Sequence, residues 1–223
     1  MRRICLKNWF YMTKQSSRSR GLTLAELVMA LSVVCIIMAA VATLSFAIGS
    51  ADDSSDDTCQ KQSQLRYATI RVGGLVRNAR LICGYDAAEV AIWKEDSNGD
   101  NQINPAELCY LEAGCERNKL TLVEFEGGGA FASIAIPIET IKSGQARSYL
   151  PSICTVCSID LISECSSVEF TVDTDTPYTK QLTIRFNLAE NDVMRPYEIN
   201  TSLRCWAGYL LDQTGELVSV DDD

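Results

Sequence analysis

One long apolar run dominates the hydrophobic pattern of the chain. It covers positions 27–49, and the residues that interrupt it are Ser32, Thr43, Ser45 and Gly49. A helix of 23 residues at a rise of about 1.5 Å per residue spans roughly 34 Å. This length is enough to cross a bilayer, so the pattern predicts a membrane-spanning helix near the amino terminus.

Apolar residues at helical spacing continue after the membrane run. Between positions 58 and 80 they are Leu65, Ala68, Val72, Leu75, Val76 and Ala79. Steps of three and four place them on one face of an amphipathic helix. Gly73 and Gly74 weaken that helix by roughly 1 kcal/mol each relative to alanine. The acidic, serine-rich stretch 50–57 is either a flexible joint or the source of the second helix's N-cap and favourable charge.

The remainder of the chain has the pattern of strands. Short apolar or alternating runs predict strands at positions 90–93, 109–111, 120–125, 133–138, 168–172, 182–188 and 197–206. The runs 168–172 and 182–188 flank the turn-rich segment 173–177, which predicts a long antiparallel hairpin. We therefore expect an α+β fold in which one long N-terminal helix packs on an antiparallel β-sheet head.

A basic leader precedes the apolar run. Positions 1–21 hold six basic residues and no acid, so the positive-inside rule keeps the leader in the cytoplasm. An ordinary secretory signal has a shorter apolar core followed by small residues, an alternative that Ala39, Ala40 and Ala47 leave open. The other alternative is a plain membrane anchor, which needs neither a glycine-bounded leader nor an intramembrane glutamate.

The junction between leader and helix carries a specific motif. Positions 21–26 are Gly-Leu-Thr-Leu-Ala-Glu, and Glu26 directly precedes the apolar run, where a carboxylate is costly without a partner. The motif resembles the processing site of type IV prepilins. This resemblance implies that a prepilin peptidase cuts after Gly21 and methylates the new amino terminus at Leu22.

Glu26 corresponds to the fifth mature residue, where the resembled family carries its glutamate. The resemblance implies that this carboxylate meets the positive α-amine at Leu22 of a neighbouring subunit in the filament. A charge pair in an apolar layer costs far less than an unpaired charge, which costs several kcal/mol. The alternative is a carboxylate near a helix end that extends towards the polar interface.

The same resemblance implies an organisation for the whole chain. A cleaved leader (1–21) precedes a transmembrane and filament-core helix (22–49) and an exported head (50–223). The protein would span the bacterial inner membrane once, with its head in the periplasm, before it joins other pilins or pseudopilins. The hairpin-rich head is closer to the larger minor pilins or the J-type pseudopilin than to a small major pilin.

A second motif occupies positions 96–107, where Asp, Asn and Glu recur at fixed spacing. Calcium takes six to eight oxygen ligands, which an EF-hand loop supplies from positions 1, 3, 5, 7, 9 and 12. On that pattern the ligands are Asp96, Asn98, Asp100, the Gln102 carbonyl, Asn104 and a bidentate Glu107. Asn101 replaces the usual glycine, although asparagine tolerates positive φ, and predicted strands flank the loop. The alternative to a calcium site is a polar turn.

Ten cysteines divide by compartment. Cys5 lies in the leader and Cys35 in the membrane helix, and the head holds Cys59, Cys83, Cys109, Cys115, Cys154, Cys157, Cys165 and Cys205. Eight cysteines in an exported head permit up to four disulfides in 105 connectivities. Cys109 with Cys115 is a candidate for closing a small loop. The Cys154-x-x-Cys157 spacing also suits a redox pair or, with Cys165, a zinc site.

Composition argues against nucleic-acid binding and catalysis. Without the leader the chain has 14 basic and 29 acidic residues, a formal charge of −15, whereas phosphate contact needs clustered lysine and arginine. The chain contains no histidine, the usual base for serine and cysteine nucleophiles, and no glycine-rich phosphate loop follows a predicted strand. We therefore expect no enzymatic activity and no nucleic-acid partner.

These observations favour a structural, minor subunit of a type IV pilus or a type II secretion pseudopilus with a calcium-stabilised head. The alternative is a membrane-anchored calcium-binding adhesion or sensing module that does not polymerise. An exported enzyme is a third and weaker alternative. Cleavage and methylation at Leu22 would separate the first class from the others.

Overall fold

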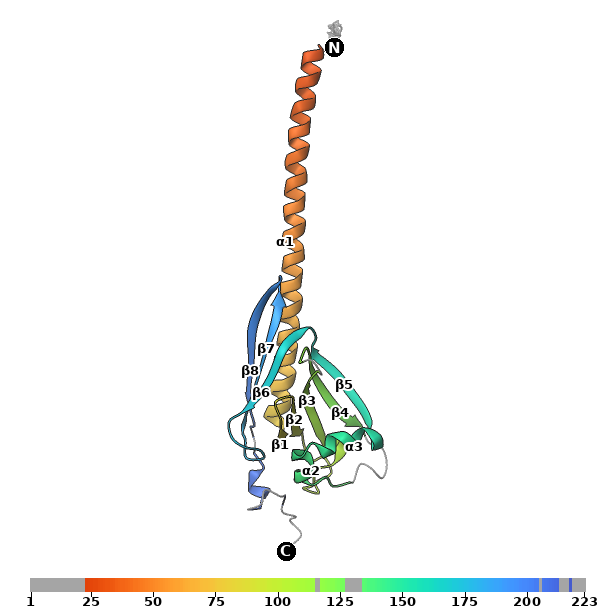
Figure 1. Ribbon diagram of the computed structural model, residues 1–223, viewed down its shortest axis with the longest axis vertical. Coiled ribbons are helices and arrows are strands. Elements are labelled where there is room, and N and C mark those ends of the chain that lie inside the picture. Colours follow the sequence, from red (N-terminus) through yellow and green to blue (C-terminus); the bar gives the residue numbers. More distant parts are fainter. Residues whose placement is uncertain (1–22, 115–116, 127–133, 205, 213–216, 218–223) are drawn as a thin grey trace, which may run out of the picture. The chain divides into compact units, whose positions relative to one another are not determined.

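The computed structural model describes residues 23–114, 117–126, 134–204, 206–212 and 217. Its contacts divide the chain into two units, 1–52 and 53–223. Helix α1 (Leu24–Asn78) is 55 residues long and is labelled in Figure 1. The acidic stretch 50–57 is helical throughout and forms part of α1. Its aspartates and serines are exposed or half-buried helical residues that do not begin a second helix.

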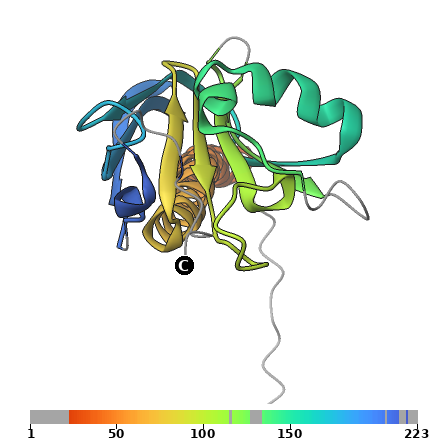
Figure 2. The same cartoon turned by 90° about the horizontal axis from the view of Figure 1, so that it is seen from below.

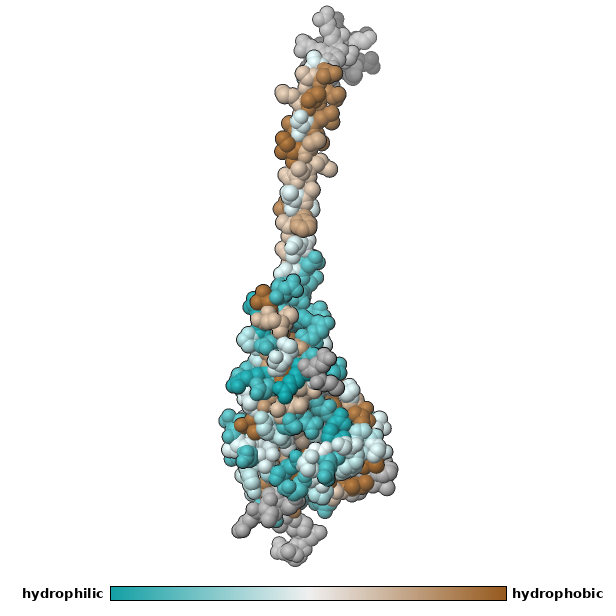
Figure 3. Space-filling view, in the orientation of Figure 1, coloured by the Kyte–Doolittle hydropathy of each residue, from teal (hydrophilic) through white to brown (hydrophobic). Residues whose placement is uncertain are grey.

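The first unit consists of the apolar part of α1. Its side chains are exposed throughout the described positions, and hydrophobic residues gather along this part of the helix in Figure 3. Within the described residues, α1 is the helix whose length and composition suffice to cross a membrane. An apolar surface of this extent is costly in water, which makes α1 a candidate membrane anchor.

Two antiparallel sheets form the second unit, as the α+β expectation requires. The five-stranded sheet has the order β1 (Leu81–Tyr85), β2 (Glu89–Trp93), β3 (Leu108–Ala113), β4 (Leu120–Glu126) and β5 (Thr155–Ile162). The three-stranded sheet contains β6 (Cys165–Val172), β7 (Gln181–Glu190) and β8 (Val193–Ser202). Short helices α2 (Ile138–Lys142) and α3 (Gln145–Ile153) precede β5, and 3-10 turns cover Pro105–Glu107 and Gly208–Leu210.

The predicted long hairpin is confirmed, because β6 and β7 pair antiparallel. Asp173 holds its turn by accepting hydrogen bonds from the backbone N–H groups of Lys180 at 2.9 Å and Gln181 at 3.0 Å. Partial burial raises the pKa of Asp173, but these bonds and one from Thr179 outweigh it and lower that pKa to about 2. The turn therefore keeps its carboxylate ionised.

The structure corrects two predicted strands. Residues 134–137 have no regular structure and Ile138 begins α2, so the strand expected at 133–138 is wrong over its described part. The Ile136 N–H donates to the Ile103 carbonyl, and Pro137 has no N–H for a ladder bond. The last strand is Val193–Ser202 and not 197–206. Strands β1 and β5 and helices α2 and α3 were not predicted.

One hydrophobic core lies between α1 and both sheets. The helix contributes Ala68, Val72 and Val76, each fully buried. The five-stranded sheet adds Ile82, Ile92, Leu111 and Leu122, and the three-stranded sheet adds Val168, Phe170, Leu182, Ile184, Phe186, Leu188 and Ile199. Figure 2 shows the strands of both sheets beside the helix. These helix residues belong to the amphipathic face that the sequence predicts.

A second core covers the opposite face of the five-stranded sheet. Trp93, Tyr110 and Phe125 are buried there, and the last two rings meet edge to face at 5.9 Å between centroids. Helices α2 and α3 close this face with Ile138, Ile141, Ala146 and Leu150. Ile103 of the candidate calcium loop is also buried in this core, so core packing anchors the loop.

We predict that Val72→Ala destabilises the isolated head, residues 53–223, by about 2 kcal/mol, because it leaves a cavity where the helix meets both sheets. Ile70→Ala is the matched control on the same helix, since the Ile70 side chain is 68% exposed and its loss should change stability by less than about 0.5 kcal/mol. Urea unfolding followed by circular dichroism measures both. Equal effects would contradict the packing described here.

Candidate functional site

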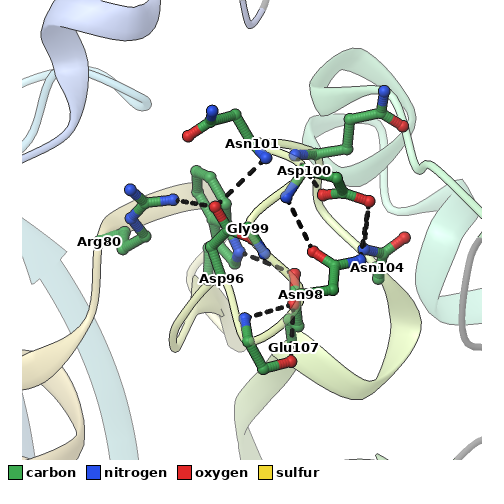
Figure 4. A network of polar contacts seen from close by, with 11 residues as sticks. Arg80, Asp96, Asn98, Gly99, Asp100, Asn101, Asn104 and Glu107 are labelled. Carbon is green, nitrogen blue, oxygen red and sulfur yellow. Dashed lines mark hydrogen bonds and ion pairs between the residues drawn. The ribbon is translucent and has the colours of Figure 1, made fainter.

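The candidate calcium loop connects β2 to β3 and is built on turns that Asp96 holds together. Asp96 Oδ1 accepts the Gly99 N–H at 2.8 Å and Oδ2 accepts the Asn101 N–H at 3.2 Å (Figure 4). Gly99 and Asn101 have φ of +77° and +55°, the left-handed region that glycine and asparagine adopt most easily. Asn101 therefore takes the conformation for which glycine is usual at position six of such loops.

Asp100 continues this pattern in the middle of the loop. Its Oδ1 accepts the Gln102 N–H at 2.8 Å, while its own N–H donates to Asn98 Oδ1 at 3.0 Å. Its Oδ2 accepts from the side-chain amides of Asn98 at 2.8 Å and Asn104 at 3.1 Å. Burial raises the pKa of Asp100, but the hydrogen bonds from Gln102, Asn104 and Asn98 together outweigh it and lower that pKa. The group is thus held as a carboxylate.

Glu107 lies at the end of the loop and is almost completely buried, with 2% exposure. Its Oε1 accepts hydrogen bonds from Ser97 N at 2.7 Å and Ser97 Oγ at 2.9 Å. Its Oε2 accepts from Trp93 Nε1 at 3.3 Å. The carboxylate therefore joins the start of the loop to its end and to the second core.

Asn104 provides a test of whether the loop suits a cation. The residue is 1% exposed, and its Nδ2 donates to Asp100. Its Oδ1 is buried and has no hydrogen-bond partner among the described residues. Leaving such an oxygen unpaired costs about 1–3 kcal/mol. An oxygen-seeking cation would satisfy it, and carboxylate and amide oxygens are the ligands that calcium prefers.

Arg80 supplies a positive charge at the first position of the loop. Its Nη1 lies 2.7 Å from Asp96 Oδ2, and its guanidinium carbon lies 4.9 Å from the centroid of the Trp93 ring. Only 6% of the Asp96 side chain is exposed, so this pair is partly shielded from water. Arg80 was not predicted from the sequence, because no spacing rule connects it to the loop.

The acids of the loop do not converge in this conformation. In the described part of the chain, no three His, Cys, Asp or Glu side chains are arranged to hold a metal ion. Asp96 is paired with Arg80, and Glu107 is bonded to Ser97 and Trp93. Three features fit a calcium ion: the carboxylate and amide oxygens, the positive φ of Asn101 and the unpaired Oδ1 of Asn104. For both Asp96 and Glu107 to coordinate the ion, their carboxylates must give up contacts with Arg80, Ser97 or Trp93.

Glu26 forms a capping box at the start of α1. Its Oε2 accepts from Thr23 N at 2.9 Å and from Thr23 Oγ1 at 3.0 Å, and its own N–H donates to Thr23 Oγ1 at 3.3 Å. The reciprocal pair satisfies N–H groups that a helix start leaves free. The Thr-x-x-Glu spacing could have revealed this box in the sequence. The expected processing residues Gly21 and Leu22 lie outside the described residues.

The described cysteines of the head form no disulfide with one another. Cys83, Cys109, Cys154 and Cys165 are buried, Cys157 is half-buried and Cys59 is exposed, all with free thiols. Burial raises the pKa of Cys83 to about 12 and that of Cys165 to about 11, which disfavours reactive thiolates. Cys115 and Cys205 lie outside the described residues, so the proposed Cys109–Cys115 bridge stays a prediction.

The Cys154-x-x-Cys157 spacing does not bring two sulfurs together in this conformation. Cys154 follows α3 with extended dihedrals, and Cys157 lies in β5. Three extended steps separate their Cα atoms by about 10 Å, and bridging requires less than about 7 Å. A redox pair at this motif would need a different backbone.

Comparison of the chain with protein-family models, with characterised proteins and with solved structures finds no match. Three features of the chain itself bear on its function: the continuous helix α1, the helix start at Thr23 and Glu26, and the polar loop between β2 and β3.

We predict that Arg80→Met destabilises the head by about 1.5–3 kcal/mol in the presence of chelator, because it leaves the shielded Asp96 carboxylate without its cation. Arg71→Met is the matched control, since Arg71 makes a more exposed pair with Glu124 at 3.8 Å and its loss should cost less than about 1 kcal/mol. Urea unfolding measures both variants. A smaller effect at Arg80 than at Arg71 would contradict the role given to this ion pair.

Proposed function

We propose that the chain is a structural subunit, of the minor-pilin or pseudopilin type, in a type IV pilus or a type II secretion pseudopilus. The observation that carries the proposal is the continuity of α1. Its first part exposes apolar side chains, and its later part buries Ala68, Val72 and Val76 in the head. The helix that meets the membrane is thus also the helix on which the head is built.

The length of α1 favours this proposal over a plain anchor. Its 55 residues correspond to about 83 Å at 1.5 Å per residue, whereas about 20 residues cross the hydrocarbon core. A plain membrane anchor accounts only for the first, apolar part of α1. A filament subunit explains the whole element, because apolar helices removed from lipid must pack against one another to stay out of water.

The contacts of Glu26 are compatible with a second partner in a filament. Both Thr23 donors use Oε2, and within the described residues Oε1 accepts no hydrogen bond. In the proposal a peptidase cuts after Gly21, and Glu26 Oε1 accepts from the methylated amine at Leu22 of a neighbouring subunit. The inner membrane holds the chain before assembly, and other pilins or pseudopilins surround it afterwards.

Calcium is the second part of the proposal. Asp96, Asn98, Asp100, the Gln102 carbonyl, Asn104 and Glu107 would hold the ion. The ion would neutralise three carboxylates in one short loop and satisfy Asn104 Oδ1. Because Ile103 and Glu107 are buried beside the second core, order imposed on the loop would stabilise the head.

For the membrane protein we predict a mature terminus at N-methylated Leu22, read by intact-mass analysis.

Glu26→Gln should leave insertion and processing intact but lower incorporation into sheared filaments at least roughly tenfold, equivalent to about 1.4 kcal/mol, because the amine loses its counter-charge. Thr23→Ala is the matched control, since it removes the capping box and keeps the carboxylate. A terminus after Ala47 would exclude the pilin proposal.

For the head we predict that calcium raises the melting temperature. Binding to the folded state alone adds about 2.7 kcal/mol at a hundredfold excess over Kd. The titration should extend to roughly millimolar calcium, where extracellular sites can bind. Asp100→Asn and Glu107→Ala should each remove most of the calcium-induced shift. Each variant is compared with itself in chelator, because Glu107→Ala also leaves Ser97 and Trp93 donors unpaired.

Calcium should raise the melting temperature of the natural head but not that of either variant. The thiol redox state is held constant throughout. A melting temperature that does not respond to calcium in the natural head would reduce the loop to a polar turn.

A further inference from the structure

Asp96 is the residue at which the proposed calcium ion would meet a cation that the protein already holds. It is the first of the proposed ligands, and Arg80 Nη1 lies 2.7 Å from its Oδ2 (Figure 4). The same Oδ2 accepts the Asn101 N–H, while Oδ1 accepts the Gly99 N–H. Oδ2 is therefore fully used, since a carboxylate oxygen offers two lone pairs.

Arg80 is held beside the loop by contacts that do not depend on Asp96. Its N–H donates to the Trp93 carbonyl at 2.9 Å, and its carbonyl accepts the Ala207 N–H at 3.0 Å. Its guanidinium carbon lies 4.9 Å from the centroid of the Trp93 ring, which is a cation–π contact. Because the Arg80 side chain is 30% exposed, its charged group can exchange Asp96 for water while the backbone stays in place.

We propose that Arg80 is an internal competitor of calcium. Its guanidinium neutralises Asp96 when no ion is bound, and it leaves that carboxylate when calcium binds. This inference rests on the calcium part of the proposed function and adds the residue that sets the affinity of the site. The ion pair stabilises the head without the ion, and the same pair weakens the binding of calcium.

Asp96 cannot serve both cations at low cost. A calcium–oxygen distance of about 2.4 Å and the 2.7 Å contact of Arg80 would hold two positive charges within about 5 Å of each other on Oδ2. Coordination through Oδ1 would still place both charges on one carboxylate. Like charges repel most strongly where water is scarce, and little of the Asp96 side chain is exposed. Calcium binding therefore requires Arg80 to give up its contact.

The other carboxylates of the loop meet no such competitor among the described contacts. Asp100 accepts from amide N–H groups, and Glu107 accepts from Ser97 and from Trp93. These donors are neutral, so none of them brings a full positive charge next to the ion. Arg80 is thus the residue whose removal should raise the affinity of the loop for calcium.

Calcium titration of the full chain in detergent tests the competition. Isothermal titration calorimetry with calcium chloride measures Kd at constant ionic strength, because salt screens the charges involved. We expect Arg80→Met to lower Kd at least roughly tenfold, a coupling typical of linked sites. Coupling is reciprocal, so the loss of stability that Arg80→Met causes in chelator should shrink at saturating calcium.

Two variants serve as controls for the titration. Arg80→Lys keeps a positive charge beside Asp96 and should stay close to the natural Kd. Arg71→Met also removes one positive charge from the head, but Arg71 pairs with Glu124 and not with the loop. It should therefore leave Kd unchanged, which separates local competition from a general effect of net charge.

The reactivity of Arg80 supplies a measurement that needs no variant, and it keeps the test valid if Arg80→Met does not fold. Phenylglyoxal modifies accessible guanidinium groups, and mass spectrometry of peptides quantifies the modification at each arginine. Calcium should increase modification of Arg80 in the natural chain. Arg66 and Arg77 are exposed on α1 and should react equally with and without calcium.

Two results would overturn the inference and leave the proposed calcium site in place. They are equal Kd values for the natural chain and Arg80→Met, and calcium binding that leaves the reactivity of Arg80 unchanged. Calcium binding by Arg80→Met alone would support the competition and would show that Arg80 prevents binding in the natural chain. If neither chain binds calcium in the millimolar range, the calcium part of the proposed function fails and this inference fails with it.

Discussion

The buried face of α1 is the contact on which the rest of the head depends. The two sheets are separate hydrogen-bonded units, and their apolar faces meet in one core that contains Ala68, Val72 and Val76. A sheet needs another layer to cover its apolar face, and here one helix covers both sheets. Small and β-branched side chains on that helix let the strands approach closely. The opposite side of the helix consequently stays free for other contacts.

The end of α1 connects this core to the polar loop. Directly after the helix, the Arg80 N–H donates to the Trp93 carbonyl and the Arg80 carbonyl accepts the Ala207 N–H. Its guanidinium reaches Asp96, and Trp93 reaches Glu107. A cation proposed for the loop would therefore act where the helix, β2 and the C-terminal segment meet. Binding of that cation would therefore affect the stability of the head through Arg80 and Trp93.

Charged residues of α1 stabilise local structure, and one of them, Glu26, also has a role in the proposed assembly. Glu26 satisfies the helix start through Thr23, while its second oxygen is assigned to a neighbouring amine in the proposed filament. Asp57 accepts the Asn191 N–H, whereas Asp56 faces outward without an ion pair among the described residues. Adjacent acids thus differ in their surroundings, because Asp57 holds a turn of the head while Asp56 is exposed.

Local periodicity made the apolar helix, the inner face of its continuation and the β6–β7 hairpin predictable from the sequence, because neighbouring residues impose these patterns. The run 133–138 was misassigned and β5 was missed, because a strand requires a pairing partner that local alternation does not specify. Spacing alone also identified the candidate calcium ligands of the loop. Only the tertiary structure decided that Arg80, Ser97 and Trp93 bind those carboxylates, since folding brings these residues together from separate elements.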